Sequence, residues 1–362
     1  MLNYKDRWAN IALKLENAKS TLIDETIQNG SFVERPKKIV SALEKFKHSS
    51  NQGIIVYSIS KAIGGNEKIS LFSGLTGDFL GDLIRVYDSI VEVRESERKN
   101  RSSLYKLDSY ELICIYTTLL MLANKCLYEI SKTNSEERFN RLTEVILNFP
   151  YLSIPDKNRE SFKTLPKTEI AYDIVNRISD YGKILGSIAA IPIANSTLQI
   201  DISASVGKNF CAGMHIIDEV HDFLSGEDIF KKKFGNYIFG QLNDFTSRED
   251  RILLNEYMKS ESLTERDVRN IIDMAINNCT LDNVMNMIKR YMKISKKEFL
   301  QISPIEDPES KKFVIDTFDY VADVIERTMK AYHSDVNYVD KLKYLPRDGV
   351  LQSRMPCSYF IE

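Results

Sequence analysis

The sequence lacks several features that assign proteins to common classes. Its 49 lysines and arginines are balanced by 51 aspartates and glutamates, for a formal net charge of −2, so there is no overall basic surface for nucleic acid. No uncharged apolar run approaches the ~20 residues that span a bilayer. The amino-terminal segment alternates charged with apolar residues and has no signal-peptide core. We expect no nucleic-acid partner and no transmembrane segment.

Paired cysteines are also missing. The five cysteines form no Cys-x-x-Cys pair, and their number is odd. A disulfide framework normally uses an even set at close, regular spacing. We therefore interpret these residues as buried thiols in a reducing compartment, and we expect a cytoplasmic protein.

Helix-breaking residues are few. Nine prolines and fifteen glycines punctuate 362 residues, alternating β-branched runs are short, and helical periodicity is nearly continuous. This pattern predicts an all-α protein. The clearest helical segments are 107–130, which we expect to be a buried central helix, and 170–194, 205–224, 267–278, 281–292 and 310–332.

Few positions interrupt these helices. Gly64-Gly65-Asn66 has the composition of a helix end, and residues 148–168, with three prolines, predict a loop between two halves of one domain. Periodicity is lost after Tyr332. We therefore expect one helical domain over residues 1–332 and a C-terminal extension over 333–362.

Two acidic clusters lie far apart in the chain, each in a helical segment. Asp88 with Glu92, and Asp218 with Asp222, are spaced i and i+4, so each pair shares one helix face. Two such faces opposed across a cavity would suit divalent metal held by oxygen ligands and bridged by a diphosphate.

The two clusters differ in their surroundings. The first is followed by basic residues, including Arg98 and Lys99, and taken alone is typical of a solvated helix end. The second is flanked by Ile216, Ile217 and Val220, and ionised carboxylates avoid apolar settings unless they are paired or bind metal. Its two histidines lack the i and i+4 spacing of a helical zinc site.

Further cations lie near these clusters in the sequence. Residues 231–233 are three consecutive lysines that follow the second cluster, and Lys183 is a lone cation in a long apolar helix. Extension of the lysine toward the surface is the ordinary interpretation. A diphosphate inside the bundle is the alternative.

The ordered set of segments resembles the trans-isoprenyl diphosphate synthases and the wider class I isoprenoid synthase fold. Asp88-Ser89-Ile90-Val91-Glu92 is similar to the first aspartate-rich motif, DDxxD, and Arg98-Lys99 to the basic pair after it. Lys183-Ile184 is similar to a Lys-Thr pair, and residues 214–222 (MHIIDEVHD) to the second motif, FQxxDDxxD. The resemblance covers roughly half of the chain.

This resemblance implies a single large helical bundle that encloses a central apolar cavity and forms a homodimer. It also implies three Mg²⁺ ions and an allylic prenyl diphosphate substrate (C10–C20). Its metal ligands would be Asp88, Glu92, Asp218, Glu219 and Asp222, of which all but Glu219 are assigned a catalytic role. Its diphosphate ligands would be Arg98, Lys99, Lys183 and Lys233.

One of the two family substrate sites is altered in this sequence. Residues 48–53 replace a Gly-Gly-Lys-x-Leu-Arg-Pro segment whose cations grip isopentenyl diphosphate, and Gly81 replaces a histidine. Lys99 replaces an arginine of the basic pair. The resemblance therefore implies that the allylic site is retained and that the isopentenyl site is lost.

Three functions remain open at this point. The first is a Mg²⁺-dependent class I terpene synthase, which ionises the allylic diphosphate and lets the cation react internally or with water. The second is a divergent trans-prenyltransferase with another acceptor, and the third a non-catalytic synthase subunit. In the first, the aromatic residues Tyr87, Phe79, Phe210 and Tyr181 either stabilise carbocations or pack the core.

Overall fold

The computed structural model describes residues 4–29, 37–48, 51–91, 107–132, 134–149, 168–230 and 234–335. Within these ranges every regular element is a helix, so the all-α prediction is confirmed. The elements are α1 Tyr4–Asn29, α2 Lys37–Glu44, the 3₁₀ helix η1 Lys45–Lys47, α3 Asn51–Ile63, α4 Glu67–Val91, α5 Ser109–Ser131, α6 Glu136–Leu147, α8 Thr168–Ala190, α9 Thr197–Leu224, α10 Glu227–Phe230, α11 Tyr237–Phe245, α12 Arg248–Lys259, α13 Glu265–Asn277, α14 Thr280–Phe299 and α15 Pro308–Ser334.

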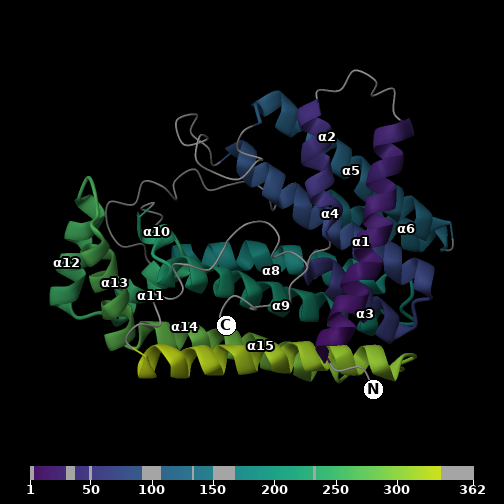
Figure 1. Cartoon of the computed structure of the whole chain (residues 1–362). Helices are drawn as coiled ribbons and strands as arrows, with labels where there is room; N and C mark the ends of the chain where they lie inside the picture. The colour runs from purple at the N-terminus through teal and green to yellow at the C-terminus, as the bar shows by residue number, and fades with distance from the viewer. Residues whose placement is uncertain are drawn as a thin grey trace.

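The helices pack around one central pair. Figure 1 shows α8 and α9 lying side by side through the middle of the molecule, with α4 crossing above them in this view and α14 and α15 running below. Helices α1, α5 and α6 gather at one end, and α12 and α13 at the other. Fully buried apolar residues such as Phe79, Ile188 and Ile217 come from α4, α8 and α9. These helices therefore form the centre of the core.

Helix ends differ from the sequence prediction where local signals compete. Helix α9 begins at Thr197, eight residues before the predicted start at 205, because the Ser196 hydroxyl accepts a hydrogen bond from the Gln199 backbone N–H and caps the helix. Helix α8 ends at Ala190 rather than at residue 194, since Pro192 has no backbone N–H to continue it. Helix α14 continues to Phe299, beyond the predicted 292.

Helix α5 was wrongly predicted as a buried central helix. Asp108 and Glu111 form a capping box at its start, and one face packs against α4. Its opposite face exposes the large side chains of Tyr110, Met121 and Tyr128. By length and composition alone α5 is the one described helix that passes a test for membrane spans, a test that half-buried core helices also pass.

Two of the four described cysteines are buried as predicted, whereas Cys114 is partly exposed and one other is exposed. Cys126 and Cys211 are buried, and burial raises the pKa of the Cys211 thiol to about 12. Cys279 is exposed at the start of α14. None of the described cysteines is in a disulfide.

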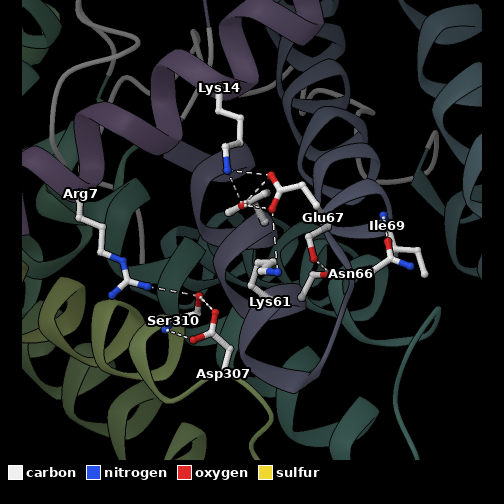
Figure 2. Close-up of polar contacts among 11 residues, drawn as sticks. Arg7, Lys14, Lys61, Asn66, Glu67, Ile69, Asp307 and Ser310 are labelled. Carbon is white, nitrogen blue, oxygen red and sulfur yellow. Dashed lines mark hydrogen bonds and ion pairs between the residues drawn. The ribbon is translucent and has the colours of Figure 1, made fainter.

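The predicted break after residue 63 is confirmed and is held by polar contacts (Figure 2). Gly64 has φ +115°, a left-handed backbone that favours glycine, and the Asn66 side chain then accepts a hydrogen bond from Ile69 N at 2.9 Å. Lys14 of α1 lies 2.7 Å from Glu67 and donates a hydrogen bond to Tyr57. These contacts tie α1 and α3 to the first turn of α4.

The predicted loop and tail lie mostly outside the described residues. Positions 150–167 and 336–362 are not described, while α15 extends to Ser334. The division into a domain over 1–332 and an extension over 333–362 therefore stays a prediction.

The backbones of α8 and α9 are in direct contact through small residues. A Cβ added to Gly186 would lie far inside van der Waals contact with the carbonyl oxygen of Ser203. Gly182 and Gly207 meet in the same way one helical turn along the pair. Residue numbers rise along α8 as they fall along α9, so the helices are antiparallel. This seam fixes α9, and with it the second acidic cluster, against α8.

We expect Gly186→Ala to destabilise the protein by about 1–3 kcal/mol, the usual cost of overpacking. The new methyl group meets backbone atoms, which cannot rotate away as a flexible side chain does. Urea denaturation followed by circular dichroism measures the change. Lys208→Ala, at an exposed position beside Gly207 on α9, is the control. A Gly186→Ala variant as stable as this control would contradict the rigid seam.

Candidate active site

The second acidic cluster lies near the C-terminal end of α9. The Asp218 side chain is exposed and Asp222 is 40% exposed, whereas Ile216, Ile217 and Val220 are fully buried. The prediction that Asp218 and Asp222 are embedded among apolar side chains is therefore wrong. They share the outer face of a helix whose apolar residues point into the core. This placement leaves both carboxylates accessible to a ligand.

The Glu219 side chain points toward the interior, where its carboxylate contacts other residues. It is nearly buried, its Oε2 accepts a hydrogen bond from Tyr237 N at 3.1 Å, and its Oε1 lies 3.3 Å from His215 Nε2. Asn236, just before Tyr237, caps α11 and donates to Asp228 at 3.0 Å. Glu219 thus braces the end of α9 against the start of α11. To act as the predicted metal ligand, the Glu219 carboxylate would have to give up these contacts.

The first acidic cluster is described only in part. Asp88 lies in the last turn of α4, but its side chain is not among those described, and Glu92, Arg98, Lys99 and Lys233 lie outside the described residues. Ser89, in place of the second aspartate of the family motif, is buried and donates to Arg85 O at 2.8 Å. Nothing further in the structure bears on this half of the predicted site.

Lys183 lies on α8, between the seam residues Gly182 and Gly186, with an exposed side chain. Helix α8 packs against both α4 and α9. Lys183 is therefore a cation on a helix that contacts both α4, which carries Asp88, and α9, which carries Asp218 and Asp222. The described residues contain no group of three or more His, Cys, Asp or Glu side chains close enough to share a metal.

A buried ionic cluster near the start of α3 was missed by the sequence analysis. Lys19 of α1 is completely buried, and its Nζ lies 2.7 Å from Asp82 Oδ2 and 3.9 Å from Asp78 Oδ2, both on α4 and also completely buried. The same Nζ donates to His48 O at 2.8 Å. On the other side Asp82 Oδ1 lies 3.4 Å from Arg85 Nη1. The i, i+4 spacing of Asp78 and Asp82 within an apolar helix was a signal for this cluster.

This cluster adjoins the residues that replace the family's isopentenyl diphosphate segment. Lys19 binds the backbone of that segment at His48. A Cβ on Gly81 would lie 2.6 Å from Gln52 Oε1 and 3.5 Å from the Tyr181 hydroxyl. The space that a side chain at position 81 would need is therefore filled by Gln52. Burial raises the pKa of Tyr181 well above its ordinary value, so this phenol stays protonated.

The aromatic residues predicted to stabilise carbocations are mostly core residues. Phe79 is completely buried, with Lys19 Nζ 5.5 Å from its ring centre. Phe210 packs against Phe318 and lines a small apolar cavity. That cavity lies between α3, α8 and α9 and is lined by Gln52, Ile55, Val56, Ile59, Leu185, Gly186, Gly207, Phe210 and Cys211. The larger central cavity stays a prediction.

Comparison with known proteins identifies the architecture. The sequence matches no protein-family model and no curated protein. Geranylgeranyl pyrophosphate synthetase from Pyrococcus horikoshii superposes with a TM-score of 0.72 at 16% identity, covering 89% of this chain and 99% of that chain. Decaprenyl diphosphate synthase from Rhodobacter capsulatus gives 0.68 at 15% identity over the same shares. This chain has the trans-isoprenyl diphosphate synthase fold.

A third solved structure with the trans-isoprenyl diphosphate synthase fold contains ligands. Geranylgeranyl pyrophosphate synthase from Corynebacterium glutamicum, complexed with isoprenyl diphosphate and magnesium, gives a TM-score of 0.67 at 13% identity, covering 88% of this chain and 99% of that chain. The described residues of this chain fit a hard divalent cation in one respect. Asp218 and Asp222 offer exposed oxygen donors one helical turn apart, the ligand type that Mg²⁺ prefers.

Proposed function

We propose that this protein is a divergent trans-prenyltransferase, which ionises an allylic prenyl diphosphate and transfers the prenyl group to an acceptor other than isopentenyl diphosphate. The fold and the solved structures that share it support prenyl transfer. The observation that carries the choice of acceptor is the buried Lys19 cluster. Lys19, the buried cation that binds the altered segment at His48 O, is neutralised by Asp78 and Asp82, so its charge is not available to bind a second diphosphate.

In the proposed site, Asp88 of α4 and Glu92, which follows α4 in the sequence, would hold Mg²⁺ from one side, and Asp218 and Asp222 of α9 would hold it from the other. Bound Mg²⁺ supplies charge stabilisation for the departing diphosphate. Lys183 of α8, with Arg98, Lys99 and one of the lysines at 231–233, would neutralise the remaining phosphate charge. Glu219 acts indirectly, because its contacts to His215 and Tyr237 N hold α9 and α11 in register.

A class I terpene synthase is the second candidate, and it uses the same carboxylates. It is favoured by the same loss of the isopentenyl site, because an ionised allylic group without an acceptor reacts with its own double bonds or with water. A non-catalytic subunit is disfavoured by the position of Asp218 and Asp222, which lie one turn apart on one solvent-accessible helix face.

Product analysis tests these alternatives. The protein is incubated with Mg²⁺ and geranyl, farnesyl or geranylgeranyl diphosphate, with and without isopentenyl diphosphate, and diphosphate release and product mass are measured. We expect release without isopentenyl diphosphate and no elongated product when it is added. A terpene hydrocarbon would favour the second candidate. Release that requires isopentenyl diphosphate would overturn the proposed choice of acceptor.

We further propose that the protein is a homodimer in the cytoplasm, joined through α5. The outer face of α5 carries Tyr110, Ile113, Met121 and Tyr128, all more than half exposed, at intervals of three, eight and seven residues. This spacing aligns them as a stripe along the helix. Lys125 beside the stripe is paired with Glu25. A stripe of this kind, flanked by paired charges, suits a second copy of the same helix.

We expect Met121→Glu to weaken the dimer at least about 30-fold, the effect of losing a central interface side chain worth about 2 kcal/mol. Sedimentation equilibrium over a range of concentrations measures it. Ile252→Glu replaces another apolar residue that is more than half exposed, on α12, away from the stripe, and should leave the dimer intact. Equal dimer affinity in both variants would contradict an α5 interface.

A further inference from the structure

The junction of α3, α4 and α8 contains buried polar atoms that the proposed allylic site does not use. Tyr181 is 3% exposed, and its hydroxyl has no hydrogen-bond partner among the described residues. Arg85 Nη1 and Asp82 Oδ1, which form an ion pair at 3.4 Å, are also buried and make no hydrogen bond in the same part of the chain. Buried polar groups are normally satisfied by protein or by ordered water. Their clustering indicates a place for a polar ligand.

Three contacts bring these groups together. The Tyr181 hydroxyl lies 3.5 Å from the position of a Cβ on Gly81, where Gln52 Oε1 also lies at 2.6 Å. Asp82 follows Gly81 on α4, and Arg85 is one turn further toward Asp88. The group therefore lies beside the part of α4 that is within two helical turns of Asp88.

The charge at this junction selects the class of ligand. Lys19 and Arg85 carry two positive charges, and Asp78 and Asp82 carry two negative charges, so the fixed charges cancel. A diphosphate would have to give up its hydration without a net positive partner, which is costly. A neutral hydroxyl loses little hydration and can both donate and accept. Tyr181 and Arg85 are donors here, Asp82 is an acceptor, and the Gln52 amide is both.

We propose that the Tyr181–Gln52–Arg85 junction binds the neutral hydroxyl group of the acceptor, either water or an alcohol. This inference rests on the proposed function and names its acceptor. The C1–O bond of the allylic diphosphate breaks, and the diphosphate leaves with the electron pair. A lone pair of the acceptor oxygen forms the new C–O bond to the allylic cation, and the hydroxyl proton passes to the released diphosphate. The product is an allylic alcohol or ether.

Oxygen labelling with a Tyr181→Phe variant tests the inference. Farnesyl diphosphate and Mg²⁺ are incubated in H₂¹⁸O, with and without 3-methyl-3-butenol as a neutral alcohol, and products are analysed by mass. An ¹⁸O-labelled alcohol identifies water as the acceptor, which is the terpene synthase outcome, and an ether of summed mass identifies the alcohol, which is the prenyltransferase outcome. We expect Tyr181→Phe to lower the oxygenated product formed per diphosphate released by about tenfold, the effect of one lost hydrogen bond. An unchanged ratio would overturn the inference.

Tyr57→Phe is a matched control because the Tyr57 hydroxyl, in the middle of α3, accepts a hydrogen bond from Lys14 and donates one to Glu67. It should lower the melting temperature and leave the product ratio unchanged. Tyr181→Phe removes a hydroxyl that has no protein partner and should leave the melting temperature unchanged or higher. A clear loss of stability in Tyr181→Phe would assign that hydroxyl a structural partner and overturn the inference. Absence of diphosphate release by the wild type would instead overturn the proposed function, while the melting comparison still tests the junction.

Discussion

An Asp218→Ala variant is expected to release diphosphate from an allylic substrate about 10²–10³-fold more slowly than the wild type, the usual effect of removing one group that stabilises developing charge. Asp218 is exposed on the outer face of α9, so its loss leaves no cavity and no buried charge. The melting temperature should therefore stay close to that of the wild type. Steady-state diphosphate release at saturating Mg²⁺ measures the effect.

The control for this variant is a carboxylate on the same helix. Asp201 is also exposed on α9, but lies more than four turns away, so Asp201→Ala should retain full activity. Raising the Mg²⁺ concentration should partly restore turnover in Asp218→Ala and change nothing in Asp201→Ala. If both variants turn over at the wild-type rate, the second acidic cluster is not the metal site.

Replacing Lys19 by methionine should destabilise the fold by about 3–5 kcal/mol, the cost of breaking a buried ion pair by removing one partner. Asp78 and Asp82 are completely buried and would be left with Arg85 as the nearby cation. The backbone oxygen of His48 would also lose its donor. Chemical denaturation measures the change, and the segment before α3 should become more accessible to proteases.

A compensated variant separates the charge effect from the loss of packing. Lys19→Met combined with Asp78→Asn and Asp82→Asn removes the uncompensated charge, and it should recover a substantial part of the lost stability. Lys125→Met breaks an exposed pair with Glu25 and should cost less than about 1 kcal/mol. Equal effects of Lys19→Met and Lys125→Met would contradict the buried cluster.

Periodicity was sufficient to predict the helical architecture, but not the limits of each helix. Residues 197–204 (TLQIDISA) alternate Ile200 and Ile202 with polar residues, a pattern that also suits a strand. In the folded chain Ser196 caps this segment, and Ser203 packs against α8. Tertiary contact therefore decided a local sequence that was ambiguous by itself.

The predicted site shows a similar limit. Sequence neighbours on a helix point about 100° apart, so apolar residues beside Asp218 said nothing about the burial of Asp218 itself. Glu219, one position along, is the residue that turns inward. The Lys19 cluster joins three segments that are distant in sequence, and no local pattern reports such a meeting. The spacing of Asp78 and Asp82 indicated the acidic part of the cluster, but nothing in the sequence indicated that Lys19 is its cation.

The contact of α8 with α9 limits how the interior of this protein can change. Where two helix backbones touch, there is no side chain that could be replaced by a smaller one. Any substitution at these glycines adds atoms and pushes the helices apart. Room for a longer hydrocarbon chain would have to come from the opposite wall, where Ile55, Val56 and Ile59 of α3 face the small apolar cavity. Under the proposed function, the length of the prenyl chain that fits should therefore change through substitutions in α3, while the two central helices keep their glycines.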